Sequence, residues 1–216
     1  MKQLVEEALD EGAAGFSSGL EYWPGILSSP EHLVPLCAAA ALRGKLYATQ
    51  VRNRDRHYDL GFGEAISAAR QAGARLQISH IQPKFGAPAQ AMQYTLEMLL
   101  RARRDGVDVA FDVIPHDWAH TTMVAVLPAW ARAGGTERTL ERLKDPALRQ
   151  RMKHNPEPIW RLVTAGRWDD IVLLRSTANA ALVGQSFAQI GQQRGVDPFD
   201  AVLDLLLEEG ESMPMA

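Results

Sequence analysis

The feature that most constrains the fold is a junction that occurs four times within the first 113 residues. At each junction a helix-like stretch ends in a glycine, and a short apolar run follows. Glycine suits the left-handed backbone conformation that ends many helices. The junctions, spaced 32, 29 and 33 residues apart, read ALDEG-AAGFSS, AALRG-KLYATQ, ARQAG-ARLQISH and ARRDG-VDVAFDV, with glycines Gly12, Gly44, Gly73 and Gly106. The repeat predicts βα units with parallel strands that are buried on both faces.

Between the apolar runs, apolar residues recur at the spacing of a helix. The predicted helices run from about Pro30 to Arg43, from about Asp59 to Ala72 and from about Pro88 to Arg104. Such alternation fits either a small open doubly wound sheet or a segment of a (β/α)8 barrel. Four strands are too few to close a barrel, and the repeat alone does not choose between the two architectures.

The repeat ends near residue 120, and the sequence predicts two parts. Residues 1–120 should form four βα units, and residues 121–216 a mainly helical region with no obvious buried strand between residues 121 and 170. Trp160 and Trp168 are expected to pack this region. The segments SFAQIGQQRG and DPFDAVLDLLLEEG are predicted helices that begin after the N-caps Ser186 and Asp197.

Composition narrows the class of protein. A net charge of −3 gives no electrostatic case for binding nucleic acid, and the charged stretch RNRDRH is expected to be a solvated loop. The single cysteine, Cys37, excludes an internal disulfide and is expected to be a core residue. No apolar run is long enough to span a membrane, and the N-terminus resembles an amphipathic helix rather than a leader. We therefore expect a cytoplasmic protein.

Polar side chains stand where each predicted strand ends, which is where functional groups collect in parallel α/β folds. His80 is the strongest candidate, because an imidazole there can bind a metal or move a proton near neutral pH. The competing interpretation is a structural histidine held by hydrogen bonds. Asp112 is an acid in an apolar strand and must have a partner there. The other candidates at strand ends are Ser18, Glu21, Tyr22, Gln50, Arg52, Gln82 and His116.

Taken together, a set of segments in order along the chain resembles the D-aminoacylase (N-acyl-D-amino-acid deacylase) branch of the amidohydrolase superfamily. These segments are ALDEGAAGFSSGLEYWPG, GKLYATQVRNR, LQISHIQ, VAFDVIPH, LPAWARAGG and GQSFAQIGQQRGVDPFDAVLDLLLEEG. The resemblance implies a partial (β/α)8 TIM barrel of about four parallel strands, followed by a helical insertion. It also implies zinc-dependent hydrolysis of C–N bonds in small acylated amino acids or amides.

Carried over residue by residue, the resemblance makes His80 one metal ligand and places Gln50 where a second histidine is expected. It implies that Arg52 meets a substrate carboxylate and that Tyr22 lines the pocket, with Ser18, Gln82 and His116 as further substrate contacts. The family's early His-x-His pair and late catalytic Asp have no counterpart in the sequence. One recognisable ligand does not make a zinc site, which needs three or four.

Gln50 therefore indicates either an altered metal site or a copy that has lost its chemistry, and we expect the isolated chain to be inactive. Two alternatives stand beside the hydrolase hypothesis. One is a non-catalytic α/β domain with a binding or structural role. The other is a fragment that associates with itself, because four parallel strands leave open sheet edges that must be covered or paired.

Overall fold

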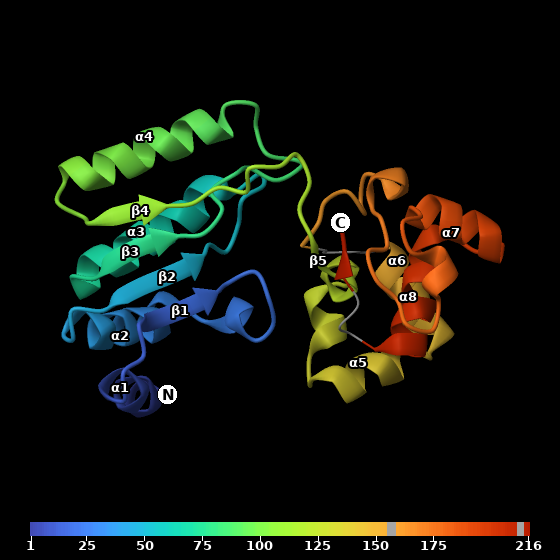
Figure 1. Ribbon diagram of the computed structural model, residues 1–216, viewed down its shortest axis with the longest axis horizontal. Helices are drawn as coiled ribbons and strands as arrows, with labels where there is room; N and C mark the ends of the chain where they lie inside the picture. Colours follow the sequence, from blue (N-terminus) through green and yellow to red (C-terminus); the bar gives the residue numbers. More distant parts are fainter. Residues whose placement is uncertain (155–158, 211–213) are drawn as a thin grey trace. The chain divides into compact units, whose positions relative to one another are not determined.

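The structure is a computed structural model that describes residues 1–154, 159–210 and 214–216 (Figure 1). It divides into two compact units, Met1–Pro115 and His116–Ala216. In the described ranges, each helix is too short or too polar to cross a lipid bilayer. We describe the two units separately.

The first unit is built on a sheet of four parallel strands, which confirms the strand arrangement that the repeat predicts. The strands lie in the order of the sequence, and Gly15, Leu46 and Arg75 stand side by side at their starts. The third and fourth strands pair from Leu76 and Val109 onward. The strands are β1 (Gly15–Gly19), β2 (Leu46–Gln50), β3 (Arg75–Ile78) and β4 (Val109–Phe111).

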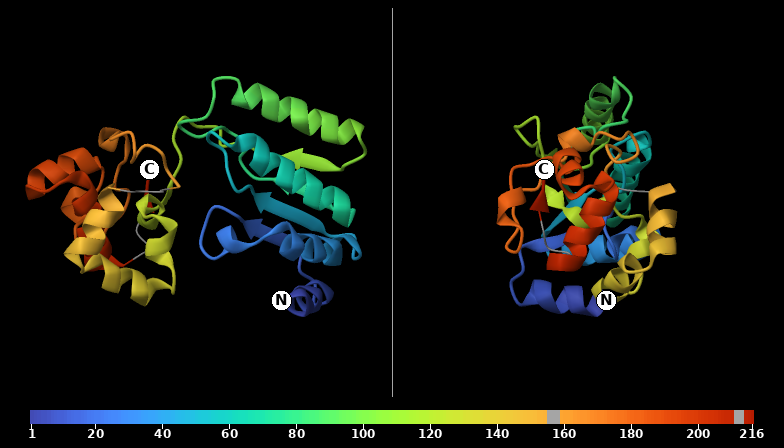
Figure 2. Two further views of the ribbon diagram at one scale, coloured as in Figure 1. Left: turned by 180° about the vertical axis from the view of Figure 1, so that it is seen from behind. Right: turned by 90° about the vertical axis from the view of Figure 1, so that its right-hand side faces the viewer.

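Helices cover one face of this sheet, as Figures 1 and 2 show from opposite sides. Their apolar sides pack on the strands to form a core that includes Tyr47, Phe62 and Leu76, and Cys37 lies fully buried in it as predicted. The four predicted glycines all adopt positive φ, from +63° to +110°. The helices are α1 (Lys2–Asp10), η1 (Gly25–Leu27), α2 (Pro30–Ala41), α3 (Tyr58–Ala72) and α4 (Ala91–Arg104).

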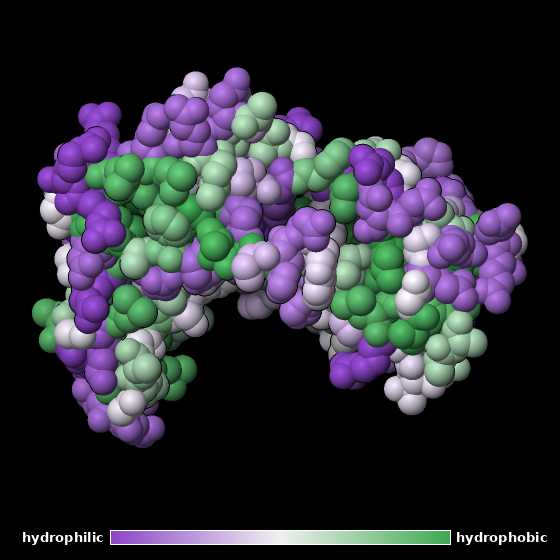
Figure 3. All heavy atoms as spheres, turned by 45° about the horizontal axis from the view of Figure 1, so that its top comes forward, coloured by the Kyte–Doolittle hydropathy of each residue, from purple (hydrophilic) through white to green (hydrophobic). Residues whose placement is uncertain are grey.

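The expectation that the strands are buried on both faces is wrong for this unit. In β2, Tyr47 and Thr49 are buried against the helices, whereas the alternate residues Ala48 and Gln50 are only partly buried. Neighbouring side chains of a strand point to opposite faces, and the helices of the unit cover only one of them. The strand β4 is an edge, and Phe111 there is 42% exposed. Figure 3 shows exposed apolar surface on this unit, bordered by hydrophilic side chains.

The second unit is mainly helical around its own core. Phe187, Phe199 and Leu206 are among its most buried side chains, and Trp160 and Trp168 pack against this core as predicted. Its elements are β5 (Thr121–Thr122), η2 (Met123–Val126), η3 (Ala129–Arg132), α5 (Thr136–Leu143), α6 (Pro146–His154), η4 (Trp168–Asp170), η5 (Ala180–Leu182), α7 (Phe187–Arg194), α8 (Pro198–Glu209) and β6 (Pro214–Met215). The pair β5 and β6, antiparallel and two residues long, is too short to leave a periodic signal in the sequence.

Both predicted helix starts in this unit are confirmed. The hydroxyl of Ser186 accepts a hydrogen bond from the Gln189 N–H, and the Gln189 side chain accepts one from the Ser186 N–H, which is a complete capping box. The carboxylate of Asp197 accepts from the Phe199 N–H at the start of α8. These bonds satisfy backbone donors that have no partner inside a helix.

Candidate strand-end site

The register of the sheet brings three chain segments together beyond the carboxyl ends of β1, β2 and β3. The ladder continues past the strands, since the Leu20 N–H donates to the Gln50 carbonyl at 3.1 Å and the Ser79 N–H to the Thr49 carbonyl at 2.9 Å. The residues that follow, Glu21 after β1 and His80 after β3, are therefore held on either side of Gln50. This is the shared rim that parallel strands predict.

A buried ion pair lies at this rim. The Lys84 ammonium donates to Oε1 of Glu21 at 2.5 Å and to Oε2 at 2.6 Å. The amide of Gln50 donates to the same Oε2 at 2.7 Å. Glu21 is only 7% exposed, and the Lys84 side chain is 15% exposed. Burial lowers the pKa of Lys84, and the nearby Arg54 guanidinium lowers it further, against the pull of Glu21.

Arg54 fixes the segment that follows β3. Its Nη1 donates to the carbonyl of His80 at 2.7 Å and to that of Gln82 at 3.1 Å. In return, the backbone N–H of Lys84 donates to the Arg54 carbonyl at 2.8 Å. Arg54 and Asp55 are 8% and 6% exposed, so the expectation that RNRDRH is a solvated loop is wrong for these two residues. Burial lowers the pKa of the Arg54 guanidinium.

The backbone of His80 adopts φ of +40°, an uncommon conformation for a residue with a Cβ. Its N–H donates to Oδ1 of Asp112 at 2.6 Å, and its carbonyl accepts from Arg54. The other oxygen of Asp112 accepts from the Gln77 amide at 3.0 Å. Asp112 thus has partners, although its side chain is exposed rather than buried. Burial lowers the pKa of His80, and the Arg54 charge adds to this effect. Both effects favour the neutral form of the imidazole.

The Arg52 side chain makes hydrogen bonds within the protein that hold a loop in place. Its Nε and Nη2 pair with the two carboxylate oxygens of Glu64 at 3.0 and 3.1 Å. Its Nη1 donates to the Ile26 carbonyl at 2.6 Å, and its Nη2 also donates to the Ser28 carbonyl at 2.5 Å. Arg52 thus ties the loop around η1 to α3. Contact with a substrate carboxylate stays a prediction.

Ser18 does not share a face with Gln50. Its hydroxyl lies 2.9 Å from the Tyr47 hydroxyl and 2.8 Å from that of Thr49, and both of these partners are buried against the helices. Because Ser18 pairs with Thr49 in the register, the alternation of side chains puts it on the helix side. The hydrogen bonds of Ser18 therefore lie within the core of the unit.

The remaining substrate candidates are spread over both units. Tyr22 is partly exposed in the loop after β1, where its carbonyl accepts from the Ile26 N–H at 2.8 Å. The Gln82 amide donates to the Ile114 carbonyl at 2.9 Å and joins the segments after β3 and β4. His116 belongs to the second unit, where its ring stacks on Trp118 with centroids 5.5 Å apart. Their roles in substrate binding stay predictions.

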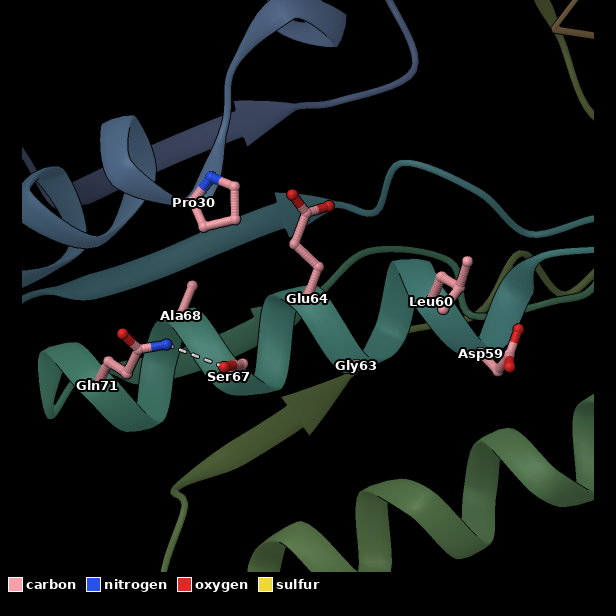
Figure 4. A pocket seen from close by; sticks show the side chains of 8 residues that line it. All are labelled: Pro30, Asp59, Leu60, Gly63, Glu64, Ser67, Ala68 and Gln71. Atoms are coloured by element: carbon pink, nitrogen blue, oxygen red, sulfur yellow. Dashed lines mark hydrogen bonds between the residues drawn. The ribbon is translucent and has the colours of Figure 1, made fainter.

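A shallow pocket lies elsewhere, on the outer side of α3 (Figure 4). It is lined by Pro30 and by residues of α3 that include Asp59, Leu60 and Gln71. Glu64 also borders it, but the carboxylate is already paired with Arg52. This pocket is formed by helices and holds none of the strand-end side chains.

The chain's own side chains at the rim do not fit a zinc ion. Among the described residues, no group of three or more His, Cys, Asp and Glu side chains is placed to hold a metal. The two proposed ligands are His80 and Gln50, and the amide of Gln50 is bonded to Glu21. Glu21, the carboxylate bonded to Gln50, already accepts from the Lys84 ammonium on both oxygens. A divalent cation would have to displace that ammonium or lie beside it.

The sequence did not single out Lys84 or Arg54 as members of the site. Lys84 lies four residues beyond His80 in a loop, and Arg54 lies in a stretch whose mixed charges suggest solvent. The burial that makes both important arises from the packing of loops that are distant in sequence. The only local signal is Glu21, an acid directly after an apolar strand that needs a partner when buried.

The fold and site together define the class of protein: a partial (β/α)8 barrel with polar groups beyond the carboxyl ends of its parallel strands. No family model matches the chain. An N-acyl-D-glutamate deacylase of Alcaligenes xylosoxydans xylosoxydans is 28% identical over 201 residues, which cover 93% of this chain and 34% of that protein. A D-aminoacylase of the same organism is 29% identical over 120 residues, which cover 54% of this chain and 24% of that protein. The chain thus spans about a third of the length of the first relative.

Solved structures agree with these relatives. The crystal structure of N-acyl-D-glutamate deacylase from Bordetella bronchiseptica, complexed with zinc and a phosphonate inhibitor, matches 99% of this chain with a TM-score of 0.73 and 24% identity. The chain covers 36% of that structure. A D-aminoacylase that defines a subset of amidohydrolases matches with a TM-score of 0.69 and 19% identity, covering 99% of this chain and 36% of the other. The fold is therefore a partial barrel rather than a doubly wound sheet.

The resemblance to the D-aminoacylase branch of the amidohydrolases is confirmed by these relatives. Metal is present in several of the neighbours: zinc in the deacylase, copper in one D-aminoacylase structure and a binuclear centre in another. In this chain, by contrast, the strand-end carboxylate is bound by an ammonium.

Proposed function

We propose that this chain forms part of the barrel of a hydrolase that acts on N-acylated D-amino acids. The observation that carries the proposal is its similarity to an N-acyl-D-glutamate deacylase over 93% of its length. The convergence of Glu21, Gln50 and His80 at one rim supports it, because barrel enzymes place their chemistry at that end of the strands.

In this proposal each residue has a role that does not depend on a metal held by this chain. His80, whose pKa is lowered by burial, would accept a proton from water or substrate through its neutral imidazole. Tyr22 and Gln82 line the rim and contact the acyl amino acid. Arg52 holds the loop that carries Tyr22 in place through the carbonyls of Ile26 and Ser28.

A second candidate function is binding without hydrolysis. The specific observation that favours it is the Lys84–Glu21–Gln50 contact, which occupies both oxygens of the Glu21 carboxylate at the rim. A domain of this kind would still recognise an acylated amino acid at the rim. It would lack the means to activate water.

One experiment separates the two functions. The protein is incubated with N-acetyl-D-glutamate, N-acetyl-D-aspartate and the L-enantiomer of each, and the release of free amino acid is measured beside binding by calorimetry. Hydrolysis selective for the D-enantiomers and lost in His80→Ala supports the hydrolase. Binding without release supports the second function, and neither binding nor release overturns both.

A further inference from the structure

The strongest unexplained feature of the rim is the pairing of a lysine with a glutamine on one buried carboxylate. Three donor contacts of 2.5 to 2.7 Å reach the two oxygens of Glu21, two from Lys84 and one from Gln50. Ionised groups that are short of water need this kind of full hydrogen bonding. The carboxylate is thereby satisfied without any bound metal.

The position of the lysine is fixed by the backbone around it. The Lys84 N–H donates to the Arg54 carbonyl at 2.8 Å, and the Lys84 carbonyl accepts from the Ala87 N–H at 3.0 Å. Arg54 in turn is bonded to the carbonyl of His80. The ammonium therefore stands on an anchored turn, and its side chain is 15% exposed.

The charges near this pair are balanced as they stand. Lys84 and Arg54 face the buried acids Glu21 and Asp55, and both acids favour the charged form of Lys84. A divalent cation would add two positive charges next to an ammonium and a guanidinium in a place with little water. Repulsion between like charges is strongest where water is excluded.

The same arrangement accounts for Gln50. An imidazole at this position would offer a metal its lone pair, whereas the amide of Gln50 offers a donor, and that donor is used on Oε2 of Glu21. A neutral donor and a cation together complete one carboxylate. Gln50 and Lys84 thus act together to satisfy the Glu21 carboxylate.

We propose that the ammonium of Lys84 is the resident cation of this rim, and that by holding the Glu21 carboxylate it excludes zinc from the strand ends that carry Gln50 and His80. The inference goes beyond the proposed function and holds whether or not the protein hydrolyses amides. It makes Lys84 and Gln50 the residues that decide whether this chain can hold a metal.

The first test is zinc content. The protein and its variants are equilibrated with zinc chloride, freed of unbound metal by gel filtration and analysed for zinc per chain. We expect no stoichiometric zinc in the wild type or in Gln50→His, because Lys84 still holds Glu21. The double variant Gln50→His/Lys84→Met should gain about one zinc per chain, and this zinc should be lost when His80→Ala is added.

The matched control is Gln50→His/Lys2→Met, which removes an exposed lysine of α1 and leaves Lys84 in place. It should behave like Gln50→His alone. One zinc per wild-type chain that disappears in His80→Ala overturns the proposal. Failure of the double variant to gain zinc, when circular dichroism shows it folded, also overturns it.

A second measurement observes the ammonium of the wild-type protein directly. In ¹⁵N NMR of the wild-type protein, the buried Lys84 ammonium should give a slowly exchanging Nζ signal, assigned by its absence in Lys84→Arg. This signal should stay unchanged when zinc is added. A shift or loss of the signal at stoichiometric zinc shows displacement of the ammonium and overturns the proposal. Because the amide-hydrolysis assay is separate, failure of either idea is recognised independently.

Discussion

Replacing Arg52 by methionine tests whether this residue is a structural tie. The guanidinium makes a two-pronged pair with Glu64 and donates to the Ile26 and Ser28 carbonyls. The side chains of Arg52 and Glu64 are 29% and 16% exposed. The pair therefore lies between an exposed salt bridge, which contributes up to ~1 kcal/mol, and a fully buried one, whose disruption costs roughly 3–5 kcal/mol.

From these limits we expect Arg52→Met to lower the free energy of unfolding of the first unit by about 2–3 kcal/mol. The reason is that Glu64 loses its counter-ion and two loop carbonyls lose a charged donor. Four of the five tryptophans lie in the second unit, so fluorescence reports poorly on the first. Amide hydrogen exchange in β2 and β3 under graded urea is the suitable assay.

A double-mutant cycle with Glu64→Met isolates the pair. The coupling between the two substitutions should be about 1–2 kcal/mol and should shrink in 0.5 M salt, because the pair is only partly shielded from solvent. Glu64→Gln keeps the shape and should cost less than Glu64→Met. A loss below about 0.5 kcal/mol in Arg52→Met, or a coupling near zero, would refute the structural role and return Arg52 to the list of free substrate contacts.

Three further outcomes follow from single sites. Burial raises the pKa of the Cys37 thiol to about 12. Only about one thiol in ten thousand is therefore ionised at pH 8, and a disulfide reagent should label Cys37 only after unfolding. Fast labelling of the native protein would contradict this. Although burial acts to raise it, hydrogen bonds from a serine, an asparagine and backbone amides hold the pKa of Glu209 at about 2. The stability that Glu209 contributes is therefore complete above its unfolded value near 4.5 and lost as the pH falls to about 2, and Glu209→Gln should flatten acid unfolding in that window. In α3, a Cβ on Gly61 would lie 2.7 Å from the Asn53 carbonyl oxygen, so Gly61→Ala should lower the free energy of unfolding by roughly 1–3 kcal/mol. A Cβ on Gly63 would meet nothing within 4 Å, so Gly63→Ala should raise it by up to ~1 kcal/mol. Thermal unfolding of the two variants checks both values.

The parts of the fold that sequence reasoning predicts well are those set by neighbours along the chain. Gly73 ends α3 because it adopts the left-handed conformation that glycine takes at no steric cost, and the cap at Ser186 depends on a residue three positions later. The parallel strands follow from a period that leaves room for one helix between them. Each of these signals lies within about 30 residues of what it predicts.

The site was less predictable because its contacts join loops that are far apart in the chain. Lys84 meets Glu21 across 63 residues, and no local pattern reveals that both are buried. The strand alternation that separates Ser18 from Gln50 was available in the sequence, but the first residue of each strand had to be known to apply it. An error of one residue moves a side chain to the other face.

The order of the strands in the first unit has a consequence for how the chain folds during synthesis. Each strand pairs with the one that left the ribosome about 30 residues earlier, and none waits for a distant partner. A growing sheet of this kind can add one strand and one covering helix at a time, so the loops of the rim meet in sequence. Glu21 therefore emerges well before Lys84, and the carboxylate must remain hydrated until the turn after the third strand arrives to bury it.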